Sequence, residues 1–145
     1  MDAHEGIERL LYHYSTTLDT GDLEGCAALF GEAGIYGLVG GAAARGAQQV
    51  LATMRGTIRM YQGAPRTRHL VTNVIIDVGD DLISGSAQSY VQVLHQAPNG
   101  PLAPIVSGTY FDRVHCLNNV WQFAERRMLI ELVGDVSSHL LTNPL

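Results

Sequence analysis

The chain has 145 residues, of which 46% are hydrophobic and 16% are charged, and its formal net charge is −5. This length and balance predict one globular domain, residues 1–145, with a buried core. The net negative charge and the lack of a basic patch argue against a nucleic-acid partner, and the short, charge-interrupted apolar runs argue against a membrane span.

The first part of the chain has the pattern of helices. Apolar residues at helical spacing predict a helix from about Ala3 to Asp19, with Gly21 closing it. Asp22 is expected to cap a second, shorter helix that runs through Phe30. Because the acidic N-terminus leads straight into a helix and does not resemble a signal peptide, we expect a cytoplasmic location.

The next segment mixes short elements. Ile35–Val39 is short and apolar and predicts a strand, whereas the glycine-rich stretch Gly40–Gly46 predicts a turn or loop. A third helix is expected over roughly 47–61, with one apolar face. Cys26 and the later Cys116 form no CxxC motif, and we expect both to be reduced, buried thiols.

From Thr67 onward the pattern is that of strands joined by turns. The predicted strands are Thr67–Val78, Leu82–His95, Ile105–His115 and Val120–Leu132. Short turns between consecutive strands predict an antiparallel meander, and the segment 133–141 is expected to be a tail that packs over a pocket or a partner. The fold class is therefore α+β, with N-terminal helices packed into a long, curved, mostly antiparallel sheet.

Strand Leu82–His95 has two different faces. One parity carries Ser84, Ser86, Gln88, Tyr90 and Gln92, and the other is mostly apolar. An ordinary sheet would put the apolar set against the helices. A sheet that lines a ligand cavity could instead turn the polar set inward and pack its apolar face on a partner subunit. The pattern leaves both arrangements open.

Three segments of the chain resemble a known family. Ile7–Phe30, with a helix ending in Asp, a Gly-Asp step and a helix ending in Leu-Phe, resembles the opening of SnoaL-like proteins of the NTF2-like superfamily. Gly108–Arg113 and Val120–Arg127 resemble the last two strands of that family. The resemblance implies a cone-like α+β barrel with one deep pocket, often as a homodimer joined through the sheets, and no cofactor.

The resemblance also implies a catalytic pair. Scytalone dehydratase, bile acid 7α-dehydratase and hexachlorocyclohexane dehydrochlorinase, within the same superfamily, use a His–Asp pair for elimination. His69 and Asp19 match those two positions, and Tyr14 matches a tyrosine of the bile acid enzyme. A carboxylate beside one imidazole nitrogen would leave the other nitrogen free to take a proton. The alternatives are a structural His–Asp hydrogen bond, a surface Asp19 and a Tyr14 that only packs in the core.

Further residues are candidates for the wall of a substrate pocket. Tyr90, Gln92 and Trp121 are expected there, and Gln92 stands where the bile acid enzyme has a second aspartate. Arg127 is the pocket arginine that the resemblance implies, with Arg126 an equal match. Because side chains alternate along a strand, at most one of these two arginines can point inward.

No motif indicates a metal or a nucleotide cofactor. The histidines have no HxH or HExxH spacing, and the glycines make neither GxGxxG nor a P-loop. The expected function is a cofactor-independent lyase or isomerase acting on a small apolar molecule, such as a polyketide, a steroid-like compound or a xenobiotic. The alternative is a non-catalytic ligand-binding or assembly protein, like the β subunits of ring-hydroxylating dioxygenases. Epoxide hydrolysis is a third possibility.

Overall fold

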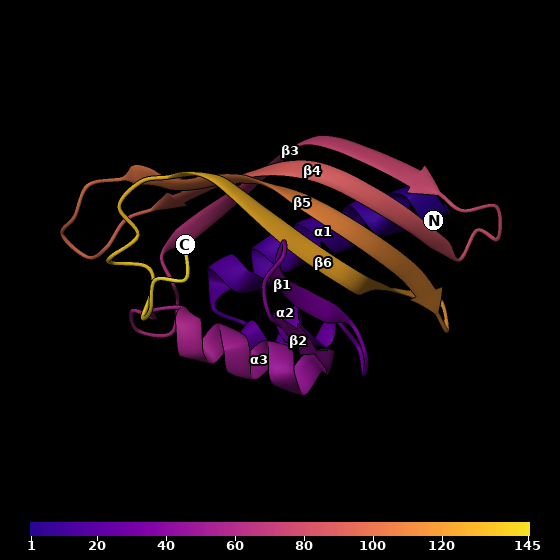
Figure 1. Cartoon of the computed structure of the whole chain (residues 1–145), viewed down its shortest axis with the longest axis horizontal. Helices are drawn as coiled ribbons and strands as arrows, with labels where there is room; N and C mark the ends of the chain where they lie inside the picture. Colours follow the sequence, from indigo (N-terminus) through magenta and orange to yellow (C-terminus); the bar gives the residue numbers. More distant parts are fainter.

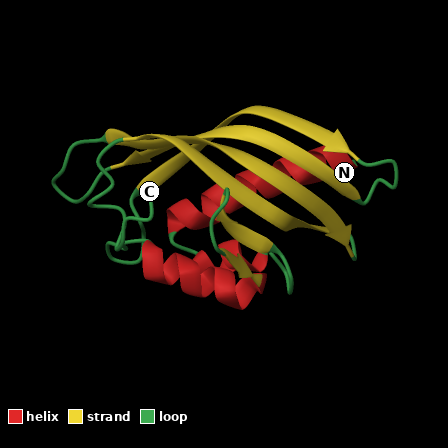
Figure 2. Cartoon of the chain, in the orientation of Figure 1, coloured by secondary structure: helices red, strands yellow, loops and turns green.

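A curved sheet of six strands arches over three helices (Figures 1 and 2). The structure is a computed structural model and describes residues 1–145. The helices are α1 (Ala3–Thr20), α2 (Leu23–Ala28) and α3 (Gly46–Thr57). The strands are β1 (Ile35–Leu38), β2 (Ala43–Arg45), β3 (Thr67–Val78), β4 (Ser84–His95), β5 (Ala103–Leu117) and β6 (Val120–Val133).

Local capping fixes the ends of the first two helices. The Asp2 side chain accepts a hydrogen bond from the Glu5 backbone N–H at 2.8 Å and begins α1. Gly21 ends α1 in the left-handed region, with φ of 86°. The Asp22 side chain caps α2 through the Gly25 N–H at 2.9 Å. These bounds confirm the first two predicted helices to within two residues.

Two predicted elements need correction. The segment Gly40–Gly46 is not only a loop, because Ala43–Arg45 forms β2 and pairs antiparallel with β1. The helix expected over 47–61 is shorter and ends at Thr57, since Ile58 already has extended backbone angles. Ile58 instead forms an isolated bridge with Leu140 of the C-terminal segment.

The sheet is mixed and open. Its order is β2-β1-β6-β5-β4-β3, and β3 to β6 form the predicted antiparallel meander. β1 pairs parallel with β6, which brings Tyr36 beside Arg126. β2 and β3 are free edges, so the strands curve without closing into a barrel. The α+β class with a curved, mostly antiparallel sheet is confirmed.

The sheet has four register shifts, and two of them decide which residues of β3 and β6 face the helices near the site. In β3 the register shifts between Thr72 and Ile75, so the inward positions change from odd to even numbers. In β6 the partner of Val114 is Phe123, whereas the partner of Arg113 is Glu125. The extra residue, Ala124, puts Phe123 and Arg126 on the same inner face.

The core lies between the concave face of the sheet and the helices. α1 contributes Ile7, Leu10, Leu11, Tyr14 and Leu18, and the apolar parity of β4 packs against it. β4 therefore follows the ordinary arrangement, with its polar parity on the outer face. None of the helices has the length and apolar character required to cross a membrane.

Candidate active site

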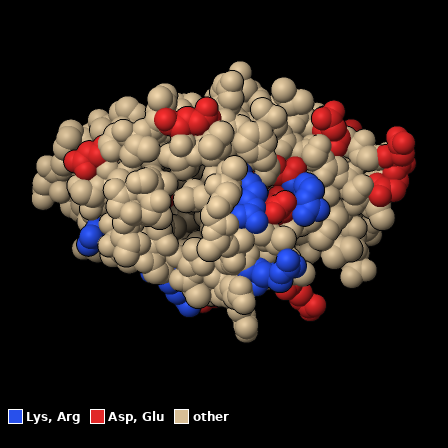
Figure 3. All heavy atoms as spheres, viewed as in Figure 1, with Lys and Arg blue, Asp and Glu red and all other residues tan.

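A cavity of about 640 Å³ opens between α3, the inner face of the sheet and the C-terminal segment. It is lined by 25 residues, 18 of them hydrophobic, and no Lys, Arg, Asp or Glu side chain is among them. Figure 3 shows a hollow in this face of the molecule, bordered by uncharged residues. The cavity therefore suits an uncharged, largely apolar molecule.

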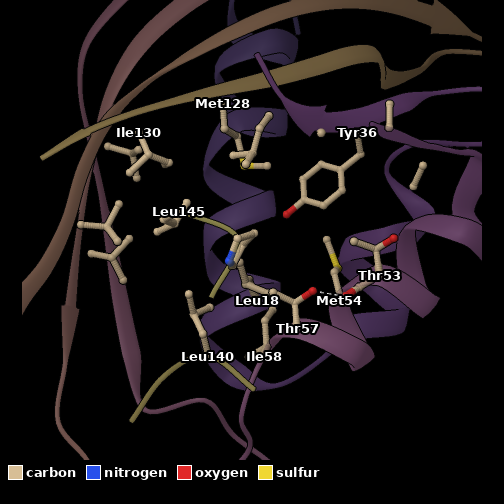
Figure 4. Close-up of a pocket in the computed structure, with 18 of the residues that line it drawn as sticks. Leu18, Tyr36, Thr53, Met54, Thr57, Ile58, Met128, Ile130, Leu140 and Leu145 are labelled. Atoms are coloured by element: carbon tan, nitrogen blue, oxygen red, sulfur yellow. Dashed lines mark hydrogen bonds between the residues drawn. The ribbon is translucent and has the colours of Figure 1, made fainter. Parts of the chain in front are cut away.

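Side chains from at least five parts of the fold converge on this cavity (Figure 4). Leu18 comes from α1, Met54 and Thr57 come from α3, and Met128 and Ile130 come from β6. Leu140 and Leu145 of the C-terminal segment close one side, so this segment packs over the pocket. The Tyr36 side chain reaches in from β1, with its hydroxyl toward the centre.

His69 and Asp19 meet at the wall of the cavity. His69 Nδ1 lies 2.5 Å from Asp19 Oδ1, and the His69 backbone N–H donates to Asp19 Oδ2 at 2.8 Å. The Thr67 hydroxyl donates to Asp19 Oδ1 at 2.8 Å. The side chains of His69 and Asp19 are only 7% and 10% exposed. The end of α1 and the start of β3 therefore hold one carboxylate with three donors.

The pKa of Asp19 shows the balance of forces at this pair. Burial acts to raise that pKa, but the hydrogen bonds and charge of His69 and the bond from Thr67 outweigh burial, so the pKa lies below its usual value. Asp19 is therefore ionised at neutral pH and holds the proton of His69 on Nδ1. The other ring nitrogen, Nε2, is left as the basic atom of a residue that lines the cavity.

A pair of tyrosine hydroxyls forms another polar group of the cavity. The Tyr14 and Tyr36 oxygens lie 2.9 Å apart and are buried, and both residues line the cavity. Burial raises the pKa of Tyr14 well above its usual value and that of Tyr36 to about 12. Both hydroxyls therefore keep their protons. One proton serves the bond between them, and the second can be donated to a ligand oxygen.

A buried ion pair supports the tyrosines from behind. Arg126 donates from Nε and Nη2 to the two carboxylate oxygens of Asp112, each at 2.8 Å, and both side chains are fully buried. The guanidinium carbon lies 3.7 Å from the Tyr110 ring centroid and 4.3 Å from that of Tyr14. Burial alone would lower the pKa of Arg126, but the charge of Asp112 and the hydrogen bonds to it have the larger effect, so the pKa is raised.

The predicted pocket residues do not line the cavity. Tyr90 and Gln92 belong to the polar parity of β4, which faces outward, while Val91 and Val93 point into the cavity. Trp121 packs beside Gly6 of α1, so closely that a Cβ on Gly6 would lie 2.4 Å from the indole ring. The structure places Tyr90 and Gln92 away from the cavity because the polar face of β4 is the solvent face, and it places Trp121 at the start of β6, outside the cavity lining.

The arginine assignment is corrected as well. Arg127 lies on the outer side, where it donates to Glu125 at 3.0 Å and to the Leu38 carbonyl at 3.1 Å. Arg126 is the inward arginine, behind the tyrosines and not at the cavity surface. The bulge at Ala124 is the reason that Arg126 faces inward in place of Arg127, because strict alternation from Phe123 would have turned Arg127 inward.

Sequence reasoning missed three groups at the cavity. Tyr36, Tyr110 and His139 all line it. Tyr36 occupies a four-residue strand whose pairing with β6 carries no local signal. His139 lies in the segment 133–141, and the expectation that this segment packs over a pocket or a partner was the one signal in the sequence that could have indicated this residue. No group of three or more His, Cys, Asp or Glu side chains has an arrangement that could hold a metal ion.

Known proteins share this fold. A Novosphingobium aromaticivorans protein proposed to be a scytalone dehydratase is 26% identical, with a TM-score of 0.75 over 91% of this chain and 86% of that one. A Mycobacterium tuberculosis protein of unknown function is also 26% identical, with a TM-score of 0.71 over 91% of this chain and 73% of that one. An NTF2-like protein with a cystatin-like fold, also from Novosphingobium aromaticivorans, is 20% identical, with a TM-score of 0.75 over 93% of this chain and 85% of that one.

The comparison with curated protein sequences gives no significant match. The family model of the SnoaL-like domain matches residues 1–127, which include both members of the His69–Asp19 pair, the Tyr14–Tyr36 pair and Arg126. The chain belongs to the SnoaL-like domain family.

Proposed function

We propose that the protein is a cofactor-independent lyase or isomerase that removes a proton from a small, uncharged, largely apolar molecule. The observation that carries this proposal is the His69–Asp19 pair, with a 2.5 Å contact, at the wall of an apolar cavity of about 640 Å³. A carboxylate that orients an imidazole and stabilises its protonated form is a common arrangement for a general base. The similarity to a protein proposed to be a scytalone dehydratase supports the same reaction class.

The chemistry follows from the two polar groups. His69 Nε2 takes a proton from a carbon next to an electron-withdrawing group, and Asp19 stabilises the imidazolium that forms. In elimination, the electron pair of the broken C–H bond forms a C=C bond, and the hydroxyl or halide leaves with its own electron pair. In isomerisation, His69 returns the proton to a different carbon. The Tyr14–Tyr36 pair donates a hydrogen bond to the oxygen on which negative charge develops.

A generic substrate can test for the base without knowledge of the natural one. With nitrobenzisoxazole, a base removes the ring C–H proton, the freed electron pair completes a nitrile, and the N–O bond breaks to give a coloured phenolate. We expect His69→Ala and Asp19→Asn each to lower this rate by roughly 10²- to 10⁴-fold, the usual contribution of a positioned base. His13→Ala, at an exposed position on α1, is the matched control and should leave the rate unchanged.

Circular dichroism must show that each variant remains folded. Equal rates for the wild type and a folded His69→Ala variant would contradict the proposal. That result would favour a binding protein that uses the same cavity without chemistry.

A further inference from the structure

A third tyrosine lies beside the Tyr14–Tyr36 pair, whose Tyr36 hydroxyl points toward the centre of the cavity (Figure 4). Tyr110 of β5 also lines the cavity, and its ring meets that of Tyr14 edge to face, with 5.9 Å between the ring centroids. Only 3% of Tyr110 is exposed. α1, β1 and β5 therefore each contribute one phenol to the same part of the cavity wall.

The Tyr110 hydroxyl differs from the other two because no group of the protein binds it. The Tyr14 and Tyr36 hydroxyls bind each other at 2.9 Å, whereas the Tyr110 hydroxyl has no hydrogen-bond partner. Its oxygen is also not one of the fully enclosed side-chain atoms that lack a partner, such as Ser89 Oγ. The oxygen therefore reaches open space, and the space that Tyr110 borders is the cavity.

The fold holds this hydroxyl in place. β5 lies between β4 and β6 in the sheet, and Tyr110 pairs with Ser89 on one side and Met128 on the other. The guanidinium carbon of Arg126 lies 3.7 Å from the Tyr110 ring centroid. Because the backbone is in a central strand and the ring packs on a buried ion pair, the hydroxyl is presented to the cavity in a fixed position.

The charge of Arg126 favours donation by the Tyr110 hydroxyl over acceptance. Two guanidinium nitrogens bind Asp112, while Nη1 has no hydrogen-bond partner and the plane of the group lies against the aromatic rings. A positive charge next to a phenol stabilises negative charge on its oxygen and opposes positive charge there. The first effect strengthens a hydrogen bond that the hydroxyl donates, and the second weakens one that it accepts.

Tyr110 keeps its proton at neutral pH and so has one to donate. Burial raises the pKa of Tyr110, and the charge of Arg126 acts in the opposite direction with a larger effect than that of Asp112. A ligand that fills the cavity displaces the water that would otherwise bind this hydroxyl. The ligand must then supply an acceptor, because an unpaired hydroxyl at a buried site costs free energy.

We propose that Tyr110 donates a hydrogen bond to a carbonyl oxygen of the ligand, so that the cavity selects uncharged ketones and related carbonyl compounds over hydrocarbons of the same shape. The inference rests on the proposed function in taking this cavity as the ligand site. A carbonyl group acidifies the neighbouring C–H bond. When His69 Nε2 takes that proton, the electron pair of the bond shifts toward the carbonyl oxygen, where Tyr110 stabilises the negative charge.

The test uses two probes of nearly equal shape, 2-acetylnaphthalene and 2-isopropylnaphthalene, with dissociation constants measured by equilibrium dialysis. Tyr110→Phe should lower the preference for the ketone roughly tenfold relative to the wild type, about the value of one hydrogen bond. Tyr90→Phe, at a position 47% exposed on the outer face, is the matched control and should keep the preference. Phenylalanine keeps the ring, so a Tyr110 that only packs predicts no change, and an unchanged preference in a folded Tyr110→Phe variant would overturn the proposal.

The carbonyl group itself provides a second readout. Infrared spectroscopy of bound 2-acetylnaphthalene with a ¹³C-labelled carbonyl reports hydrogen bonding, because a donated bond lowers the C=O stretching frequency. We expect a higher frequency in Tyr110→Phe than in the wild type. Equal frequencies in the two proteins would refute the bond.

The failure of this proposal can be distinguished from the failure of the proposed function. His69→Ala should keep the ketone preference, because His69 acts on the C–H bond. Undiminished elimination in His69→Ala together with a preference that depends on Tyr110 would refute only the proposed base. If Tyr36→Phe abolishes the preference and Tyr110→Phe does not, the hydrogen bond is wrongly assigned to Tyr110.

A measurement on the unmodified chain covers the case in which Tyr110→Phe does not fold. Nuclear Overhauser effects between the acetyl methyl group of bound 2-acetylnaphthalene and the protons of the Tyr110 ring are expected, because the carbonyl end of the probe lies at this hydroxyl. Their absence at saturating probe, with the acetyl group next to other side chains, would contradict the assignment.

Discussion

The two faces of one sheet differ in almost every respect. The inner face carries His69, the buried Arg126 and the wall of the cavity, and water reaches little of it. The outer face carries Tyr90, Leu129 and other half-exposed side chains. Groups that are to act on a ligand need the shielded face, where hydrogen bonds and charges are stronger. Which side chain reaches that face depends on the alternation of each strand and on the β-bulges that interrupt it.

Arg126 and Arg127 give the sharpest contrast, because they are neighbours on opposite faces. Arg126→Met leaves the Asp112 carboxylate buried without a partner, and we expect it to lower the free energy of unfolding by roughly 3–5 kcal/mol. Arg127→Met removes a partly exposed pair and should cost about 1 kcal/mol or less. Urea unfolding measures both. Similar losses for the two variants would contradict the assigned burial.

The outer face can be tested through association. Tyr90 and Leu129 flank Thr109 across three strands and are 47% and 40% exposed. We propose that this apolar patch joins two copies of the chain. Leu129→Lys would bury a charge at that interface and should weaken the dimer by roughly 100-fold or more in sedimentation experiments. Leu82→Lys, at an exposed turn, is the control, and a monomeric wild type would disprove the interface.

The two faces of the sheet can also be compared by the elimination rates of two tyrosine variants, one from each face. Tyr36→Phe removes a hydroxyl from the cavity, and we expect a rate roughly tenfold lower, about the value of one hydrogen bond to developing charge. Tyr90→Phe removes a hydroxyl from the outer face and should have no effect on the rate. Equal rates for Tyr36→Phe and the wild type would mean that the tyrosine pair only packs.

A smaller effect is expected from His139, on the way in which the free energy of unfolding changes at acidic pH. Its pKa is lowered to about 4 in the folded state by burial and by His69 and His95, against Asp19. Between its ordinary value near 6.5 and about 4, the unfolded chain binds a proton that the folded chain does not, so stability falls as the pH falls. In His139→Gln, the free energy of unfolding should depend less on pH over this range, as measured by urea unfolding at a series of pH values. Parallel curves for both proteins would contradict this.

Asp19 affects the stability of the protein over a lower range of pH than His139 does. Its folded pKa lies below 3.8, so its contribution to stability is complete above that value and is lost as the pH falls through the folded pKa. Asp19→Asn should therefore remove a part of the acid sensitivity below about pH 4 and leave the His139 window in place. Loss of both windows in this one variant would show that the two groups titrate together.

Much of the fold was predictable from local signals. Asp2 and Gly21 mark the ends of α1 by capping chemistry, and alternating strands from Thr67 onward predict the meander. What was not predictable depends on distant partners. β2 has only three residues and exists because β1 pairs with it, and β1 in turn pairs with β6. α3 ends at Thr57 because Ile58 pairs with Leu140.

The site divides in the same way. The contact between His69 and Asp19 was expected because both match positions of the resembled family, and Tyr14 was expected at the site for the same reason, whereas its place on the apolar face of α1 favoured core packing. The sequence could not show that Arg126 and not Arg127 points inward, because no local pattern indicates the bulge at Ala124. Tyr90 and Gln92 were placed in the pocket because a polar face can line a cavity, whereas here it meets the solvent.

The parallel pairing of β1 with β6 has a consequence for how the chain folds. It joins Tyr36 to Arg126, from opposite parts of the sequence, and such non-local contacts slow the search for the native state. The wall that Tyr36 supplies can form only after the last strand has docked. A newly made chain would therefore have its helices before it has a usable cavity, and its apolar wall would be open to aggregation until synthesis is nearly complete.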